Sequence, residues 1–210
     1  MKTEIFLIRH AEPLKDFKKL FINDIDKQLC NEKTVLSVKG EEQAKKLANL
    51  SYLSNIDVVI SSTYVRAIST AKYIVDKNNC SFLVNDDFNE RIIGYDNVDK
   101  EFWLHQMLNP ALKTDTGESQ LEVRNRMLKG INDIILKYSG KRAVVVSHAA
   151  AITFLLMNWC KLEDVKLESK LRKLVFKNKV VINDSIRTPD IFKLTFINND
   201  IDNIERLNIS

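Results

Sequence analysis

Two of the three histidines in this chain stand directly behind short apolar runs. His10, preceded by Arg9, follows the run Ile5–Ile8, and His148 stands two residues after the run Ala143–Val146. Apolar, β-branched runs of this length are typical of buried parallel strands. The carboxyl ends of such strands meet at one edge of the sheet, which is where ligands bind. The sequence therefore predicts both imidazoles at one binding edge.

A third apolar run, Asp57–Ile60, ends in the pair Ser61 and Ser62, and Arg66 comes one helical turn later. Arg66 and Arg9 each have a planar guanidinium group whose N–H donors can bind two phosphate oxygens at once. We expect the residues after each strand to open a helix, whose free N–H groups also favour an anion. A neutral imidazole in such a positive field is a competent nucleophile toward phosphorus. The pattern therefore predicts phosphoryl chemistry at this edge.

Metal binding is the competing use of paired histidines. Two neighbouring guanidinium groups would repel a divalent cation, and no cluster of carboxylates accompanies the histidines. We therefore expect no metal ion and no other cofactor. The third histidine, His105, stands between Trp103 and Met107 without comparable surroundings, and we expect it in the core or at the rim of the fold.

The composition is that of an ordinary globular protein. Of 210 residues, 45% are apolar and 29% are charged, which allows a sizeable core and favours one domain. No two of the five glycines have the spacing of a dinucleotide-binding loop, a P-loop or the nucleophile elbow of serine hydrolases. The net charge of +4 is too mild to indicate nucleic acid as a partner, although it would not repel an anionic substrate.

The cysteines exclude two further classes of site. Cys30, Cys80 and Cys160 lie too far apart for a C-x-x-C zinc or redox pair, and none has the arginine six residues on that cysteine-based phosphatases need. Free thiols and the lack of an export signal predict a reducing cytoplasm. The longest apolar stretch, Ala143–Cys160, is interrupted by four polar residues, so we expect no membrane-spanning segment.

Helical patterns alternate with the apolar runs, of which a fourth is Phe82–Val84, and this alternation predicts buried parallel strands in an α/β sheet. The predicted helices cover Glu41–Leu50, Thr63–Val75 with Ser62 as its N-cap, and Glu118–Tyr138, which ends at Ser139-Gly140.

The last part of the chain has weaker patterns. The lysine-rich segment 162–183 predicts a helix that runs into a strand. The runs Ile191–Phe196 and Ile204–Leu207 predict a closing antiparallel hairpin around Asn198-Asn199-Asp200.

Six short motifs follow one another between about residues 5 and 150. They are Leu7–Glu12 (L-x-R-H-G-E, with alanine for glycine), Leu36–Ala44 (L-T-x-x-G-x-x-Q-A), Ser61–Ala71 (S-S-x-x-x-R-A-x-x-T-A), Asn89–Gly94 (an acid-bearing L-x-E-x-x-x-G), Gly117–Ser119 (G-E-S) and Val145–Ala149 (V-V-S-H-G, with alanine for glycine). In this order they resemble the histidine phosphatase superfamily, which has the phosphoglycerate mutase-like fold. Each motif alone would be a weak signal, whereas six in the family's order are specific.

The resemblance implies roles for five residues. His10 would be the nucleophile that becomes phosphohistidine, while Arg9, Arg66 and His148 would hold the phosphoryl oxygens. Glu90 would give a proton to the leaving group and later take one from the attacking water. Such acid–base help contributes about 10²–10⁴-fold. No metal is required, because the arginines neutralise the charge.

Several positions depart from the family pattern or stay open. The two alanines that replace glycine keep a backbone N–H that can contact phosphate. Asp16 stands where members often have an asparagine that contacts phosphate, and it adds a negative charge. Glu12, Asp16 and Ser61 are further candidates for the pocket, and Asp86 and Asp87 are nearby substitutes for the proton donor.

The resemblance also bears on the type of reaction. Residues 95–98 bear no likeness to the mutase segment, and the arginine pair that mutases use for a second acidic group is not evident. We therefore interpret the chain as a metal-independent phosphomonoesterase that acts on a small molecule, with neither nucleic acid nor a membrane as partner. The alternatives are a phosphoglycerate mutase-type phosphotransferase and a non-catalytic protein that binds a phosphorylated ligand. The implied fold is a single domain over residues 1–210, a three-layer α/β/α sandwich with a mostly parallel sheet and a cap at about residues 88–117.

Overall fold

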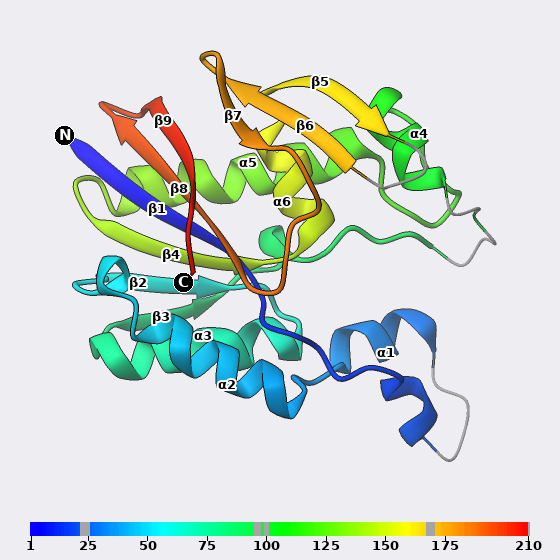
Figure 1. Cartoon of the computed structure of the whole chain (residues 1–210), viewed down its shortest axis with the longest axis horizontal. Helices are drawn as coiled ribbons and strands as arrows, with labels where there is room; N and C mark the ends of the chain where they lie inside the picture. The colour runs from blue at the N-terminus through cyan, green and yellow to red at the C-terminus, as the bar shows by residue number, and fades with distance from the viewer. Residues whose placement is uncertain (22–25, 95–97, 99–100, 167–170, 210) are drawn as a thin grey trace.

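A six-stranded sheet forms the centre of the protein (Figure 1). The computed structural model describes residues 1–21, 26–94, 98, 101–166 and 171–209. The strands of this sheet are β1 Lys2–Arg9, β2 Val58–Ser61, β3 Ser81–Val84, β4 Arg142–Ser147, β8 Asp190–Ile197 and β9 Asp200–Leu207. They lie in the order β3-β2-β4-β1-β8-β9, so that β4 separates β1 from β2.

The strands of the sheet core run parallel. β1 pairs with β4, β4 with β2, and β2 with β3, all in parallel register. β8 pairs antiparallel with β1, and β9 pairs antiparallel with β8. Asn198 and Asn199 make the turn between β8 and β9 with φ of 50° and 75°, a left-handed backbone that asparagine tolerates. The predicted α/β class, mostly parallel core and closing hairpin are confirmed.

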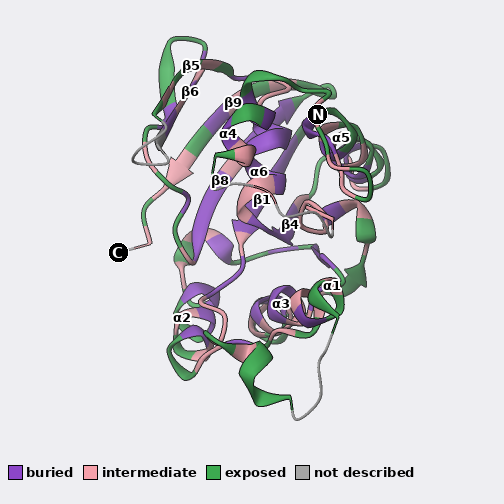
Figure 2. Cartoon of the chain, turned by 90° about the vertical axis from the view of Figure 1, so that its right-hand side faces the viewer, coloured by how far each residue is buried: buried purple, intermediate pink, exposed green. Residues whose placement is uncertain are grey.

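Helices cover both faces of this sheet. They are α2 Val38–Ala48 and α3 Val65–Asn78 on one face, and α5 Gln120–Lys137 and α6 Ala149–Leu156 on the other (Figure 1). Because side chains alternate along a strand, Phe6 and Ile8 pack with the first pair of helices and Ile5 and Leu7 with the second. Figure 2 shows the buried strands lying between these helices. The three-layer α/β/α arrangement is confirmed.

The helix ends follow local capping chemistry. The Ser37 side chain accepts a hydrogen bond from the Gly40 N–H at the start of α2, and Ser119 forms a capping box with Glu122 at the start of α5. The prediction that Ser62 caps the next helix was wrong. α3 begins after Tyr64, and the Ser62 hydroxyl accepts the Tyr64 N–H and joins a hydrogen-bond chain with His148, described below.

The strand predicted over Phe82–Val84 exists as β3, but the expectation that it is buried was wrong. β3 is the outermost strand of the sheet on its side and pairs only with β2. The side chains of its residues Phe82, Leu83 and Val84 are between 36% and 49% exposed. An apolar run of this length therefore identifies a strand without revealing that it lies at an edge.

The expected helix in segment 162–183 was also wrong. The described part of this segment forms a second, antiparallel sheet made of β5 Lys161–Lys166, β6 Leu171–Phe176 and β7 Lys179–Ile182. In β6, Leu174 and Phe176 are buried in the core, whereas Lys173 and Val175, which alternate with them, are partly exposed. This period of two is the strand pattern that the lysine content obscures.

Short elements surround the carboxyl end of the parallel strands. They are α1 Lys27–Lys33, α4 Phe102–Leu108 and the 3₁₀ helices η1 Phe17–Leu20 and η3 Asp86–Phe88. A further 3₁₀ helix, η2 Ser51–Leu53, lies at the amino end, where Arg142 at the start of β4 donates to the Tyr52 carbonyl oxygen. Figure 1 shows α1 on the α2 side of the carboxyl end, and α4 beside β5 and β6 on the opposite side. Of the segment expected to form a cap, residues 95–97, 99 and 100 lie outside the described residues. Within the described part of the chain, no helix is long and apolar enough to cross a bilayer.

Gly40 in α2 provides a test of how the loop after β1 is held. A Cβ atom at Gly40 would lie 2.1 Å from the carbonyl oxygen of Glu12, which also accepts the Ser37 N–H. Backbone cannot move aside as a flexible side chain can, so we expect Gly40→Ala to lower the free energy of unfolding by about 1–3 kcal/mol. Helix propensity alone would raise the free energy of unfolding by up to about 1 kcal/mol. Urea unfolding of wild type and Gly40→Ala shows whether the substitution lowers or raises this free energy.

The matched control is Glu42→Ala at an exposed position of the same helix. We expect that change to shift the free energy of unfolding by no more than about 0.5 kcal/mol. A stabilised Gly40→Ala protein would contradict the close approach of α2 to the loop after β1.

Candidate active site

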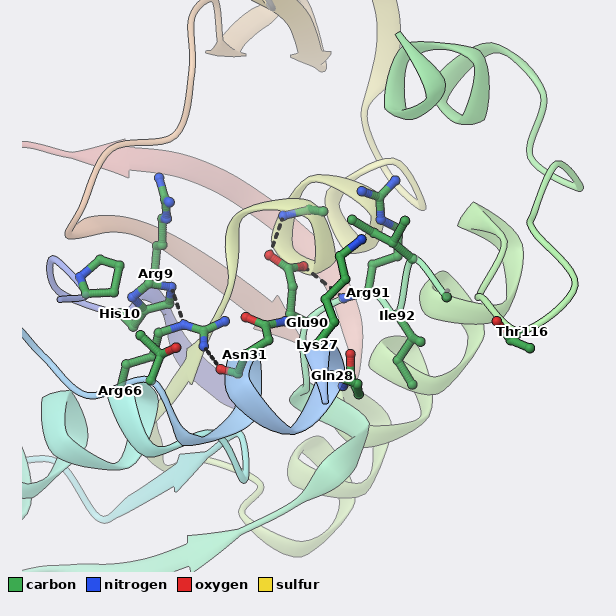
Figure 3. A pocket seen from close by; sticks show the side chains of 15 residues that line it. Arg9, His10, Lys27, Gln28, Asn31, Arg66, Glu90, Arg91, Ile92 and Thr116 are labelled. Atoms are coloured by element: carbon green, nitrogen blue, oxygen red, sulfur yellow. Dashed lines mark hydrogen bonds between the residues drawn. The ribbon is translucent and has the colours of Figure 1, made fainter. Parts of the chain in front are cut away.

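A cavity of about 650 Å³ opens at the carboxyl ends of β1, β2 and β4. The end of β1, the start of α3 and the segment after η3 each contribute charged side chains to it. The residues that carry the argument are Arg9, His10, Arg66, Glu90 and Arg91, together with Lys27, Gln28 and Asn31 of α1. Figure 3 shows these side chains around one space. The topology thus brings together residues that are up to 82 positions apart.

His10 is buried at the base of this cavity, with a fixed tautomer. Its Nδ1 lies 2.7 Å from the Ala11 carbonyl oxygen, which can only accept, so Nδ1 carries the proton. Its Nε2 accepts a hydrogen bond of 3.1 Å from Nε of Arg66. Burial and the charge of Arg66 lower the pKa of His10 to about 3. The imidazole is therefore neutral at physiological pH, with its lone pair on Nε2.

Arg66 connects three separate parts of the site. Besides the bond to His10, its guanidinium donates to the carbonyl oxygen of Asn31 in α1 (Figure 3). It also donates to Nδ1 of His148 at 3.2 Å. All three acceptors are uncharged at neutral pH. Burial lowers the pKa of Arg66, and the charge of Glu90 opposes that shift. The site therefore holds a buried positive charge on neutral partners.

His148 lies behind His10 and is fully buried, with the two ring centres 5.0 Å apart. Because its Nδ1 accepts from Arg66, its Nε2 carries the proton and donates to the Ser62 hydroxyl at 2.8 Å. Ser62 in turn donates to Oδ1 of Asn89, which also accepts from the N–H of Thr63. Burial and the nearby His10 and Arg66 lower the pKa of His148 well below its ordinary value. This histidine is neutral and fixed in orientation.

Glu90 reaches the cavity from the segment after η3 and meets the start of α6. Its carboxylate accepts the N–H of Ala151 at 3.0 Å, that of Ala150 at 3.4 Å and that of Arg91 at 2.9 Å. The free N–H groups expected to favour a phosphate at this helix start thus already meet an anion. Asp86 is exposed, and Asp87 pairs with Lys129 at 2.8 Å, so neither aspartate lies beside the histidines.

Two sequence expectations about the loop after β1 were wrong. The residues directly after β1 form a loop instead of a helix. The N–H of Ala11 donates to Oγ1 of Thr70 at 3.0 Å within the core, so it is already paired. The main chain at this point holds the loop against α3 and has no free N–H here for an anion.

Three residues considered for the pocket lie elsewhere in the described structure. The carboxylate of Glu12 meets Ser37 and Lys39 at the start of α2. Asp16 is exposed, with a left-handed backbone, and lines a separate surface hollow. Ser61 is fully buried and donates to the carbonyl oxygen of Ser62. None of the three lines the cavity that contains His10.

The sequence analysis missed several residues that line or support this cavity. Asn31 and Gln28 come from α1, a helix of seven residues whose apolar pattern is too short to predict a helix. Asn89 accepts three hydrogen bonds that join β2 to the segment bearing Glu90, and Arg91 lines the cavity beside it. His105 lies on α4 as an exposed residue near Glu101, which fits the rim and not the core. Among the described residues, no three His, Cys, Asp or Glu side chains gather as a metal site.

Comparisons with known proteins agree with one another. The family model described as "Histidine phosphatase superfamily (branch 1)" matches residues 5–172. A protein of Escherichia fergusonii named "Probable phosphoglycerate mutase GpmB" is 26% identical over 159 residues, which cover 71% of this chain and 71% of that protein.

Solved structures resemble the whole fold. A mycobacterial glucosyl-3-phosphoglycerate phosphatase in complex with inorganic phosphate gives a TM-score of 0.65 at 16% identity and covers 98% of this chain and 95% of its own. A phosphoserine phosphatase mutant from Entamoeba histolytica, in complex with phosphoserine, gives 0.62 at 17% identity and covers 97% and 96%. At these identities the likeness concerns the fold alone.

The lowered pKa of His10 predicts a pH-dependent stability. The unfolded histidine binds a proton below about pH 6.5, whereas the folded one stays neutral down to about pH 3. Protonation of the unfolded state therefore lowers the free energy of unfolding as the pH falls below about 6.5, and above that pH His10 causes no such loss. Between pH 7.5 and 5, we expect wild type to lose about 2 kcal/mol more unfolding free energy than His10→Asn does. Urea unfolding at several pH values measures this difference.

The control for this experiment is His105→Asn, because His105 is exposed. We expect its unfolding free energy to vary with pH as that of wild type does. A His10→Asn protein with the same pH dependence as wild type would show that His10 is not held neutral in the fold.

Proposed function

Because the chain belongs to branch 1 of the histidine phosphatase superfamily, we propose that it hydrolyses a small phosphomonoester through a phosphohistidine on His10. One observation carries the proposal. His10 is a neutral imidazole with its proton on Nδ1 and its Nε2 lone pair beside Arg66, in a cavity that also holds Arg9 and Glu90. A nucleophile in a positive pocket suits an anionic phosphoryl group.

In the first step, Nε2 of His10 attacks phosphorus and the bond from phosphorus to the leaving oxygen breaks. Since Nε2 accepts from Arg66 in the free protein, that hydrogen bond must break first. The guanidinium then turns to the phosphoryl oxygens, to which it donates more strongly than to an uncharged ring. Arg9 and Arg66 stabilise the negative charge that shifts among these oxygens. The hydrogen bond from Nη2 of Arg66 to His148 keeps the guanidinium positioned meanwhile.

Glu90 supplies the proton transfers. It must enter the first step as the carboxylic acid, and it gives this proton to the leaving oxygen and becomes the carboxylate. In the second step it takes a proton from a water molecule, which attacks phosphorus as the bond to Nε2 breaks and phosphate leaves. Its place in the same cavity as His10 supports this role, as does the distance of Asp86 and Asp87 from the site. The arginines supply the positive charge, so we propose a reaction without a metal ion.

A phosphoglycerate mutase-type transfer is the second candidate, because the curated relatives carry that name. A mutase would have to keep the phosphoryl group on His10 until an acceptor alcohol arrives. Intact mass after exposure to a phosphoester separates the candidates, since a phosphatase loses the added phosphoryl group to water. We further propose the cytoplasm as the compartment, which the three free cysteines support.

Release of phosphate from p-nitrophenyl phosphate tests the proposal. We expect turnover by wild type in the presence of EDTA, and background rates only for His10→Ala, because His10 is the group that we propose forms the covalent intermediate. The matched control is His105→Ala, which removes an exposed histidine and should keep wild-type turnover. Retained turnover in the His10→Ala protein would reject the phosphohistidine mechanism.

The role of Glu90 has a separate test in the leaving group. Nitrophenolate leaves without a proton, whereas an alkoxide needs one. We expect Glu90→Gln to lower kcat/KM by about 10²–10⁴-fold for an alkyl phosphate and by less than about 10-fold for p-nitrophenyl phosphate. The control is Asp86→Asn, at an exposed carboxylate of the same segment. Equal losses on both substrates would assign Glu90 to positioning, through its bonds to the start of α6.

A further inference from the structure

The motif Gly117–Ser119 lies against residues 87–92, which we call the acid-bearing segment, although no residue of the motif lines the cavity. The N–H of Glu118 donates to the carbonyl oxygen of Ile92 at 2.8 Å, and the Ile92 N–H donates to the Glu118 carboxylate at 2.9 Å. A Cβ atom on the glycine of the motif would lie 2.4 Å from the carbonyl oxygen of Ile93, so the close approach needs glycine. The motif thus fixes the chain directly after the proposed proton donor.

Arg126, in the second turn of α5, holds the main chain of the same segment. Its Nη1 donates to the carbonyl oxygens of Asp87 at 2.8 Å and Asn89 at 2.9 Å, and its Nη2 donates to that of Glu90 at 3.3 Å. Its Nε and Nη2 also bind the two carboxylate oxygens of Glu118, at 2.7 Å and 2.9 Å. A guanidinium group has five N–H donors, and all five of Arg126 have an acceptor here.

The arginines of the cavity differ from Arg126 in this respect. Among the described residues, the buried Nε atoms of Arg9 and Arg91 have no hydrogen-bond partner. Arg126 lines neither the cavity that contains His10 nor the smaller space beside it, and it has no donor left for a ligand. Its effect on the proposed reaction must therefore pass through the protein groups that it binds.

Main-chain contacts set the position of the Glu90 carboxyl group in the cavity (Figure 3). It accepts the N–H groups of Ala150, Ala151 and Arg91, which belong to the start of α6 and to the segment itself. A shift of the main chain at Glu90 would therefore move the carboxyl group relative to α6. Proton transfer needs the two heavy atoms about 2.6–3.2 Å apart. A misplacement of about 1 Å can lower a rate about 10²-fold, so the segment has to be held closely.

We propose that Arg126, held by Glu118, is a positioning residue for Glu90. It fixes the main chain of the acid-bearing segment so that the carboxyl group lies within reach of the leaving oxygen. The inference rests on the proposed function and adds a residue to its proton-transfer step. The planar fork of Arg126 matters here in addition to its charge, because the compact ammonium group of a lysine cannot bind a carboxylate in two places and three carbonyl oxygens as well.

The first test compares benzyl phosphate, whose alkoxide needs a proton, with p-nitrophenyl phosphate, whose leaving group does not. We expect Arg126→Met and Arg126→Lys each to lower kcat/KM by about 10–10²-fold for benzyl phosphate and by less than about 3-fold for p-nitrophenyl phosphate. Equal losses on the two substrates would assign Arg126 to general structure and overturn the inference. Full activity of Arg126→Lys on benzyl phosphate would also overturn it, because charge alone would then suffice.

The matched control is Arg124→Met, one turn of α5 from the same segment. Arg124 donates to the carbonyl oxygen of Met157 at 3.0 Å and to the side chain of Asn158 just beyond the other end of α6. We expect this variant to change kcat/KM by less than about 3-fold on both substrates, since its contacts do not touch the acid-bearing segment. If Arg126→Met does not fold, Glu118→Gln removes the anion that holds Arg126 while keeping the size of the side chain, and the same selective loss is expected.

A double-mutant cycle shows whether Arg126 acts through Glu90. Once Glu90→Gln has removed the proton donor, its position no longer matters for the leaving group. We therefore expect Arg126→Met to cost less than about 3-fold on benzyl phosphate in the Glu90→Gln background, against about 10–10²-fold in wild type. The same loss in both backgrounds would overturn the inference.

Amide hydrogen exchange gives a readout that needs no turnover. The N–H of Ala151 lies in the first turn of α6, where it has no acceptor within the helix, and it donates to the Glu90 carboxylate. We expect its exchange to be about 10-fold faster in Arg126→Met and unchanged in Arg124→Met. Unchanged exchange in a folded Arg126→Met protein would overturn the inference. Failure of the proposed function would be seen separately, as absent wild-type turnover or as turnover retained in His10→Ala.

Discussion

The buried guanidinium of Arg66 is the interaction on which the rest of the site depends. It donates to His10, to His148 and to a carbonyl of α1, which binds the carboxyl ends of the strands to the helix that covers them. Because it can only donate, both rings must present a lone pair to it, and a second proton on either ring would bring a charge close to its own. The neutral state and the tautomer of each histidine thus follow from one arginine. The Ala11 carbonyl and the Ser62 hydroxyl complete this pattern at the other nitrogen of each ring.

Sheet topology explains why residues so distant in sequence share this arginine. The order β2-β4-β1 places three parallel strands side by side, and His148 and His10 directly follow two of them. Arg66 lies in the first turn of the helix that follows the third strand. The register pairs Arg9 with Ser147, so the two histidines continue from neighbouring positions of adjacent strands. A short apolar run followed at once by a polar residue is therefore enough to specify this part of the site.

That pattern is also the reason why sequence analysis reached His10, His148, Arg9 and Arg66 but missed other contributors. Those four positions depend on strand ends, which leave a local signal. Asn31 depends on where the short helix α1 packs, and nothing local to that helix indicates that its carbonyl meets Arg66. Asp16 stands where family members often have an asparagine that contacts phosphate, yet its left-handed backbone places it at the surface. Ser62 was interpreted as a cap, because its side-chain partners His148 and Asn89 are remote in sequence.

The buried guanidinium of Arg66 links binding to reactivity under the proposed function. In the free protein, Arg66 covers the lone pair of His10 that would attack phosphorus. A phosphoryl group offers charged oxygens, and hydrogen bonds to charged acceptors are roughly twice as strong as those to neutral ones. It would therefore be favourable for Arg66 to exchange the His10 ring and the Asn31 carbonyl for phosphoryl oxygens. This exchange would free Nε2 of His10 only when a phosphoryl group is present. The carboxylate of Glu90 stays at the start of α6, away from that exchange, because it rests on the N–H groups of Ala150 and Ala151. The same guanidinium that covers the nucleophile in the free protein would then make it available when the substrate binds.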